Sequence, residues 1–212
     1  MSATATDLHD SQPVLHAGPA LKDARLAVVA IHGRGASADD MIGLAGELQL
    51  HDVAFLAPQA ANNTWYPHSF LTPMERNEPW LSSALARIRG LVAMLATEGI
   101  DPARVGVLGF SQGGCLALEY AARHPKVYAA VVGLSGGLIG PPGTPRDYPG
   151  SLDGTPVFLG CSDVDQHIPI ERVQESAAVM KGMGAAVDLR IYKGMGHTVN
   201  RDEVEAVRAL LR

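Results

Sequence analysis

The sequence predicts an α/β fold in which a mostly parallel sheet is covered by helices on both faces. Apolar runs of strand length alternate with segments of helical periodicity along the chain. The runs are continuously apolar, which is typical of parallel strands buried on both faces. No repeat, linker-like composition or insertion long enough for a cap domain is visible. We therefore expect one domain over residues 23–212, after a flexible N-terminal lead over residues 1–22.

Two strands and the helix between them open the expected domain. Residues 24–33 and 52–61 are short, continuous apolar runs. Between them, Ser37 and Asp40 have the spacing of a capping box, which predicts the start of a helix. The apolar face of that helix holds Met41, Leu44 and Leu48.

Residues 62–79 interrupt this alternation. Aromatic side chains stand there among prolines, asparagines and glutamates with no clear period. A loop of this length inside a compact domain is often functional. A helix is expected after it, ending at Gly99, with an apolar face of Leu81, Leu85, Ile88, Val92 and Leu95.

The second half of the chain returns to regular alternation. Its four expected strands are residues 104–110, 128–134, 155–161 and 186–194. A helix is expected over residues 112–124, and Pro169 predicts the start of the next one. The C-terminal helix should begin at Asn200 as N-cap, because acidic residues fill its first turn.

Composition limits the classes of function. The chain has 212 residues, a net charge of −5 and no basic block, which argues against nucleic-acid binding. The N-terminal stretch lacks the features of a signal peptide, and no apolar run reaches the roughly 20 residues of a membrane helix, so no integral membrane association is expected. Cys115 and Cys161 lack paired-motif spacing, and free thiols in a cytoplasmic protein are the simplest interpretation.

Two G-x-S-x-G segments come directly after expected strands, at residues 109–113 and 133–137. In a nucleophile turn of this type, strand and helix backbones nearly touch, so the residues two positions either side of the serine must be small. Glycine inside a helix otherwise costs roughly 1 kcal/mol relative to alanine. A helix can follow Ser111, whereas prolines exclude one after Ser135. We therefore expect Ser111 to be the nucleophile and Ser135 to lie in a turn near the site.

A serine nucleophile requires a histidine base, and the base requires an orienting acid. The acid and then the histidine should follow the serine along the chain. This order excludes His9, His16, His32, His51 and His68. Of the others, His124 ends a helix and His167 lies in the expected acid loop. His197 lies in a glycine-flanked loop after the last strand, and we expect it to be the base.

The loop after the fifth strand offers two acids, Asp163 and Asp165, and the residues by themselves do not separate them. The oxyanion should be held by two backbone N–H groups, that of Gln112 and that of Arg34 in the loop after the first strand. The Arg34 side chain has two interpretations: it meets an acidic substrate group, or it is a solvated loop arginine.

Five segments, HGRGASADD, LAPQA, GFSQGG, DQHIP and GMGH, occur in this order within residues 25–212. Together they resemble the phospholipase/carboxylesterase family of small α/β-hydrolases, which includes bacterial carboxylesterases and acyl-protein thioesterases. The resemblance implies the α/β-hydrolase fold and identifies the acid as Asp165, the aspartate of the family's D-x-x-[IV]-P motif. Arg34 stands where the family usually has leucine, which leaves a backbone role in the oxyanion hole unaffected.

These residues predict a carboxylesterase that uses a Ser111–His197–Asp165 triad and an acyl-enzyme on short to medium acyl chains. The expected partner is a small-molecule ester or thioester, and no metal ion or organic cofactor is implied. An exposed apolar loop is compatible with a homodimer. The residues expected to line an acyl groove, or else to fill the core beneath the loop, are Trp65, Tyr66, Phe70, Leu71 and Met74.

Three alternatives stay open. A lysophospholipase or acyl-thioesterase would act on longer acyl chains. Dienelactone hydrolase-like enzymes use a cysteine where Ser111 stands, and Cys115, one helical turn further on, fits packing better. A non-catalytic small-molecule receptor on the same fold usually lacks a complete triad, whereas all three positions are filled here.

Overall fold

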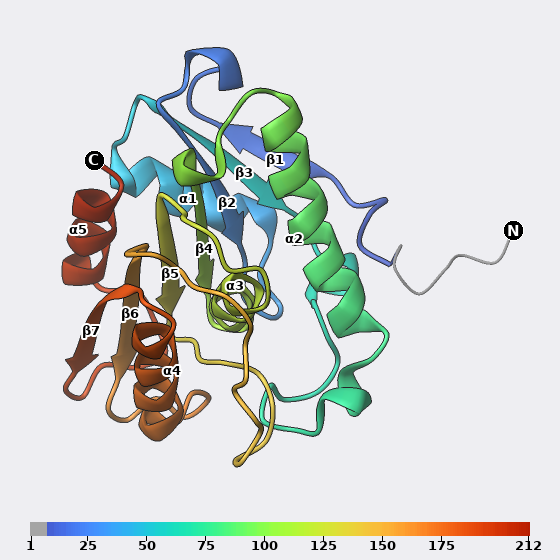
Figure 1. The fold of residues 1–212 in the computed structure, drawn as a ribbon, viewed down its shortest axis with the longest axis vertical. Coiled ribbons are helices and arrows are strands. Elements are labelled where there is room, and N and C mark those ends of the chain that lie inside the picture. Colours follow the sequence, from blue (N-terminus) through green and yellow to red (C-terminus); the bar gives the residue numbers. More distant parts are fainter. Residues whose placement is uncertain (1–7) are drawn as a thin grey trace, which may run out of the picture.

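The computed structural model describes residues 8–212, which contain a seven-stranded sheet in the order β1-β3-β2-β4-β5-β6-β7 (Figure 1). The strands are β1 (Val14–Ala17), β2 (Leu26–Ile31), β3 (Val53–Pro58), β4 (Val105–Phe110), β5 (Ala130–Leu134), β6 (Pro156–Ser162) and β7 (Ala186–Tyr192). The α-helices are α1 (Ala38–Leu48), α2 (Trp80–Thr97), α3 (Gln112–Arg123), α4 (Ile170–Gly182) and α5 (Arg201–Leu210). Short 3-10 helices lie at η1 (Leu21–Asp23), η2 (Ala61–Asn63), η3 (Met74–Asn77) and η4 (Pro102–Arg104).

Strands β2 to β7 run parallel to one another, and each corresponds to an apolar run of the sequence. The five α-helices correspond to the five expected ones, including capping boxes at Ser37 and Asn200. The predicted fold class, a mostly parallel sheet with helices on both faces, is confirmed.

The N-terminal segment differs from the flexible lead expected over residues 1–22. Residues 14–17 form β1, which pairs antiparallel with β3, with Val14 opposite Pro58 and Ala17 opposite Phe55. This edge strand is short and only partly buried, so it has no continuous apolar run to reveal it. Its order comes from backbone hydrogen bonds to β3, which sequence patterning does not report. Residues 1–7 of the expected lead lie outside the described residues.

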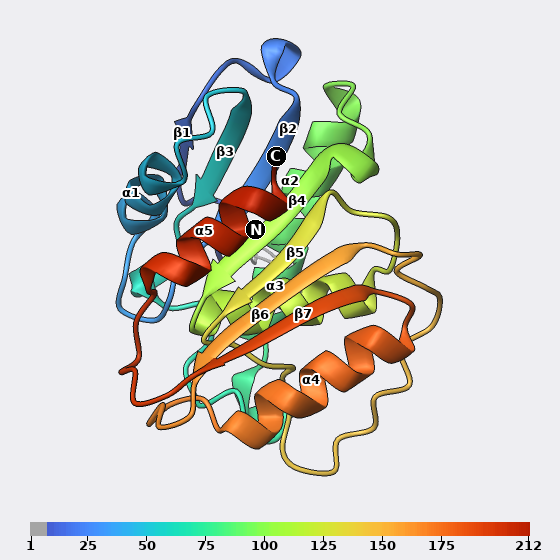
Figure 2. The ribbon, with the colours of Figure 1, turned by 90° about the vertical axis from the view of Figure 1, so that its left-hand side faces the viewer.

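Two hydrophobic clusters cover the two faces of the sheet. Helices α2, α3 and α4 pack on one face, through residues such as Leu85, Leu116 and Val173. Helices α1 and α5 pack on the other, through residues such as Met41 and Val207. Figure 2 shows α5 crossing the near face of the sheet while α3 lies behind the strands. None of the helices in the described part of the chain is long and apolar enough to cross a membrane.

The parallel arrangement determines where a site can form. The carboxyl ends of β2, β4, β6 and β7 lie at the same edge of the sheet, since these strands share one direction. The loops after these four strands hold Arg34, Ser111, Asp165 and His197 respectively. Ligands of open parallel sheets bind beyond this edge, so residues far apart in the sequence meet there.

Candidate active site

Ser111 occupies a sharp turn between β4 and α3. Its backbone has φ 54° and ψ −119°, a conformation that residues with a side chain rarely adopt. A Cβ atom on Gly109 would overlap the carbonyl oxygen of Gly113, and one on Gly113 would overlap the carbonyl oxygen of Ile31. Both glycines are therefore required by close approach of backbones, as their spacing around the serine predicted. The turn holds the hydroxyl clear of the sheet at the N-terminus of α3.

A chain of hydrogen bonds links the serine to His197 and Asp165. His197 Nε2 lies 2.8 Å from Ser111 Oγ, and His197 Nδ1 lies 2.7 Å from Asp165 Oδ2. A carboxylate only accepts hydrogen bonds, so Nδ1 carries the proton and Nε2 is free to accept one from the serine hydroxyl. The ring of Phe110 packs 4.9 Å from the imidazole, centroid to centroid, and supports its orientation.

Asp165 is held in place and kept ionised. Its side chain is fully buried, and its Oδ1 accepts hydrogen bonds from the amides of His167 and Ile168 at 2.8 and 3.1 Å. Burial acts to raise the pKa of this carboxyl. The hydrogen bonds from His197 and the two amides outweigh burial and hold the pKa below its usual range.

The other residues considered as the acid or the base, Asp163, His124 and His167, have different contacts. Asp163 Oδ1 accepts from the amide of Gly194 at 2.8 Å, so this acid closes a turn between two loops. His124 caps the C-terminus of α3 and packs on the Tyr120 ring. The ring of His167 stands edge-on to that of His197, 4.8 Å away between centroids, at the mouth of the site.

Two backbone N–H groups are available beside the serine. Gln112 begins α3, so its amide has no helical carbonyl to bond. The Arg34 amide has no protein acceptor within the described residues, whereas the next two amides, of Gly35 and Ala36, are both engaged. The loop that carries Arg34 runs directly past the nucleophile, since a Cβ on Gly33 would lie 3.2 Å from Ser111 Cβ.

The side chains of these two residues hold the aromatic loop. Gln112 Nε2 donates to the carbonyl of Tyr66 at 2.9 Å, and Gln112 Oε1 accepts from the amide of Trp65 at 2.8 Å. The Arg34 guanidinium donates to the carbonyls of Pro67 and His68, both at 2.6 Å. The Arg34 guanidinium is therefore anchored to this loop, although the residue remains exposed to solvent.

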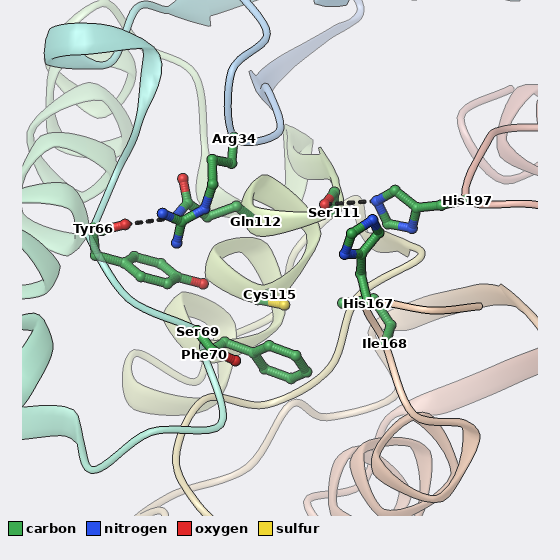
Figure 3. A pocket seen from close by; sticks show the side chains of 10 residues that line it. All are labelled: Arg34, Tyr66, Ser69, Phe70, Ser111, Gln112, Cys115, His167, Ile168 and His197. Carbon is green, nitrogen blue, oxygen red and sulfur yellow. Dashed lines mark hydrogen bonds between the residues drawn. The ribbon is translucent and has the colours of Figure 1, made fainter.

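A cavity of about 390 Å³ opens beside the serine (Figure 3). It is lined by Arg34, Tyr66, Ser69, Phe70, Ser111, Gln112, Cys115, His167, Ile168 and His197. A second hollow of about 340 Å³ lies beyond the imidazole, lined by Val164, Gln166, His167, Gly194, Met195, Gly196 and His197. Figure 3 shows Arg34, Tyr66 and Phe70 on one side of Ser111, with His197 and His167 on the other.

The groove predicted from the aromatic loop is only partly present. Tyr66 and Phe70 line the cavity, but Trp65 does not. Trp65 is fully buried, donates from Nε1 to the carbonyl of His32, and packs against the His9 ring. Met74 lies outside the cavity, with its sulfur next to the Arg123 guanidinium.

Of the two expected roles, Trp65 has the second, filling the core beneath the loop, because an aromatic loop without periodicity does not reveal which side chains point inward. Sequence reasoning also missed lining residues such as Ser69 and Ile168. The isoleucine lies in the acid-loop motif, so its chain position was a usable signal.

Cys115 and Cys161 are free and buried. Burial raises the pKa of each thiol to about 12, so both are protonated at neutral pH and are poor nucleophiles. No cluster of three or more His, Cys, Asp or Glu side chains suited to a metal ion occurs within residues 8–212.

Comparisons with known proteins agree with this geometry. The sequence profile described as Phospholipase/Carboxylesterase matches residues 19–212. Acyl-protein thioesterase 1 of Saccharomyces cerevisiae is 26% identical, over 91% of this chain and 94% of that protein. Acyl-protein thioesterase 1 of Gibberella zeae is 34% identical, but the match covers 58% of this chain and 53% of that protein. The chain thus spans about half the length of that relative.

A solved structure aligns with nearly the whole chain. It is a phospholipase/carboxylesterase from Dyadobacter fermentans, with 41% identity, a TM-score of 0.92, and coverage of 95% of this chain and 97% of that one. A carboxylesterase from Arabidopsis thaliana, SOBER1, has a similar fold with a TM-score of 0.75 at 21% identity, covering 89% of this chain and 98% of the solved one.

Proposed function

The chain belongs to the phospholipase/carboxylesterase family of carboxylic ester hydrolases and has the α/β-hydrolase fold, and from this premise we propose that it cleaves esters by nucleophilic catalysis at Ser111. One observation carries the proposal: the unbroken chain of hydrogen bonds from Ser111 Oγ through His197 to the buried carboxylate of Asp165. This arrangement has the geometry of a nucleophile, a base and an orienting acid.

The proposed reaction has two halves. Ser111 Oγ attacks the carbonyl carbon while His197 Nε2 takes its proton, and the imidazolium then protonates the departing alkoxide or thiolate. A water molecule, deprotonated by the same imidazole, attacks the acyl-enzyme and releases the acid. Asp165 holds the Nδ1–H tautomer and stabilises the imidazolium in both halves.

The developing oxyanion would accept hydrogen bonds from the amides of Arg34 and Gln112. The positive end of α3 points at the same place, because Gln112 is its first residue. Each such donor contributes about 3–4 kcal/mol to stabilisation of the transition state in other acyl-transfer enzymes. Both amides belong to the backbone, so the function tolerates the replacement of the family's usual leucine by Arg34.

We propose short to medium acyl chains as substrates. A cavity of about 390 Å³ with a polar rim and a floor at Phe70 and Cys115 fits a few methylene groups better than a long lipid chain. Buried, unpaired thiols at Cys115 and Cys161 support the further proposal of a reducing, cytoplasmic location. Cleavage of thioesters is the second candidate, favoured by the names of the Saccharomyces and Gibberella relatives.

The test combines active-site labelling with a substrate series. A fluorophosphonate should attach to Ser111, as mapped by mass spectrometry, and labelling should be lost in the His197→Ala variant. Hydrolysis of p-nitrophenyl esters from acetate to palmitate should peak at short to medium chains, with matched acyl thioesters run alongside. A peak at palmitate would move the assignment to long-chain lipids, and absence of both adduct and turnover would overturn the proposed function in favour of a receptor.

A further inference from the structure

The geometry separates the acyl side of the site from the leaving-group side. A leaving group must take its proton from His197 Nε2, so it departs on the side of Ser111 where His197 lies. The acyl group then extends to the opposite side of Ser111, where Figure 3 shows Arg34, Tyr66 and Phe70. The chemistry of these side chains therefore indicates which acyl groups the site accepts.

A positive charge is fixed at the wall on this acyl side. The two Nη atoms of Arg34 each donate to one backbone carbonyl, of Pro67 and of His68, and its Cζ lies 5.9 Å from the centre of the Tyr66 ring. These bonds use two of the five N–H groups of a guanidinium. The carbonyls are neutral, so they hold the group in place without compensating its charge.

The charge has no acidic partner in the protein. Within the described residues Arg34 forms no ion pair, although it lines the cavity. The cavity lining contains no Asp or Glu. Two acids lie near the cavity, and both have partners. Asp165 is bonded to His197 and to two amides. Glu119, near Tyr66 and Cys115, is paired with Arg123 and bonded to Tyr148. A cavity whose one permanent charge is positive favours an anion.

A second polar group belongs to Tyr66, a side chain that also lines the cavity. The hydroxyl of Tyr66 is buried, with 1% of the residue exposed, and has no oxygen or nitrogen partner within the described residues. Its neighbour is the thiol of Cys115, a weak hydrogen-bonding group. A buried hydroxyl without a good partner costs free energy unless a ligand completes its bonding. An aliphatic acyl chain would leave this hydroxyl unpaired.

We propose, resting on the function proposed above, that the acyl group of the substrate carries a carboxylate, which pairs with Arg34 and is assisted by the hydroxyl of Tyr66. The substrates are then monoesters or monothioesters of short dicarboxylic acids. Water supplies the oxygen and hydrogen atoms of hydrolysis, so the products are the free dicarboxylic acid and an alcohol or thiol. Phe70 and Cys115 contact the methylene groups between the two acid functions.

The first measurement compares two esters of equal chain length, monoethyl glutarate and ethyl pentanoate, by pH-stat at pH 7.5. Alkyl esters are used because the activated aryl monoesters of glutarate cyclise without enzyme. Solvent weakens the ion pair between the substrate carboxylate and the exposed Arg34. We therefore expect kcat/KM for monoethyl glutarate to be about tenfold higher than for ethyl pentanoate. The preference should shrink as the salt concentration rises. A preference for the pentanoate ester would overturn the inference.

Two variants of one residue separate charge from positioning. Arg34→Lys keeps the charge and loses the paired bonds to the carbonyls, whereas Arg34→Gln loses the charge. Both variants should lower turnover of both esters, since the aromatic loop is less firmly held. The ratio between the esters should persist in Arg34→Lys and fall to about one in Arg34→Gln. Arg201→Gln, which removes an exposed charge on α5 outside the cavity, should keep the wild-type ratio.

The outcomes distinguish this inference from the proposed function. If ethyl pentanoate is cleaved and Ser111 is labelled by a fluorophosphonate, the proposed esterase activity is supported, whatever the ratio of kcat/KM between the two esters. An unchanged preference in Arg34→Gln would then overturn the role of Arg34 alone. Absence of turnover of either ester, together with absence of the adduct, would overturn the function and the inference together.

Discussion

Residues 109–113 and 133–137 have the same G-x-S-x-G pattern and share two features of backbone geometry. Each comes after a parallel strand, β4 or β5, and each serine has a positive φ, 54° at Ser111 and 45° at Ser135. The serine amides also bond alike, with Ser111 N donating to the Leu134 carbonyl at 2.8 Å and Ser135 N donating to the Gly160 carbonyl at 2.7 Å. The backbone therefore has a serine with positive φ and a bonded amide at the ends of two adjacent strands.

The two turns differ in the segment that each serine leads into and in the contacts of the two hydroxyls. After Ser111 the chain enters α3, and Ser111 Oγ reaches His197. After Ser135 a Cβ on Gly136 would collide with the backbone of Gly114 in α3, so the second turn lies beneath the first. Ser135 is fully buried, and its Oγ has no oxygen or nitrogen partner within the described residues.

The comparison shows that a strained serine turn is not by itself a catalytic site. The second turn packs against the N-terminus of α3 and so supports the first. A histidine within reach, an open cavity and a helix N-terminus occur together at Ser111 only in the described part of the chain. Equivalent positions in and around the two turns should therefore respond differently to the same substitution.

The largest expected difference is between the two serines. Ser111→Ala should lower kcat by about 10⁵–10⁶-fold, because the covalent step is removed. Ser135→Ala should change kcat less than about threefold and leave stability nearly unchanged, since its hydroxyl has no strong partner to lose. Steady-state ester hydrolysis and urea unfolding measure both. A fluorophosphonate adduct at Ser135, or a large rate loss in Ser135→Ala, would reverse the assignment of the two turns.

In the loop after β6, Asp163 and Asp165 should also differ in the effect of substitution on kcat. Asp165→Asn should lower kcat about 10⁴-fold, because an amide no longer selects the Nδ1–H tautomer of His197. Asp163→Asn should retain most activity, since its partner is the amide of Gly194. Steady-state hydrolysis of one short-chain ester by the two variants measures this difference. Similar losses in the two variants would contradict the assignment of Asp165.

The lowered pKa of Asp165 also makes the stability of the fold depend on pH. A carboxyl with a pKa lower in the folded than in the unfolded state stabilises the fold above the unfolded value of about 3.9, and this stabilisation is lost as pH falls through the folded value. The difference in unfolding free energy between wild type and Asp165→Asn should therefore shrink below about pH 4. A difference that grows on acidification would contradict this ionisation state.

A smaller effect, on stability, separates the glycines that precede the two serines. A Cβ on Gly109 would overlap backbone atoms of Gly113, whereas one on Gly133 would meet the flexible side chain of Leu118 at 2.7 Å. Gly109→Ala should cost at least about 3 kcal/mol in unfolding free energy, and Gly133→Ala about 1 kcal/mol. Urea midpoints at equal m-values test this order. Equal costs would mean that α3 can shift away from β4.

The smallest effect is expected at the cysteine beside each turn, Cys115 in α3 and Cys161 in β6. With a pKa of about 12, each thiol is about 10⁻⁴ ionised at pH 8. Iodoacetamide should leave both unmodified and activity intact over an hour, while urea-unfolded protein should label at both positions. Rapid alkylation of Cys115 with loss of activity would revive a role for cysteine chemistry in the cavity.

Sequence patterning by itself determined strands β2 to β7, the five α-helices and the chain positions at which polar residues leave the sheet. Continuous apolar runs indicate strands buried on both faces of the sheet. Turns such as 109–113 depend on local backbone geometry, so they too can be predicted from the sequence. The family resemblance was needed to choose Asp165 over Asp163, and the matching family profile confirms that resemblance.

Only the tertiary structure decided the features that depend on partners distant in sequence. Strand β1 exists because β3 offers it backbone hydrogen bonds, and Trp65 points inward because the carbonyl of His32 accepts its indole N–H. The Arg34 guanidinium faces the cavity because two carbonyls more than thirty residues away hold it there. Side-chain direction in an irregular loop is set by such long-range contacts, which local periodicity does not encode.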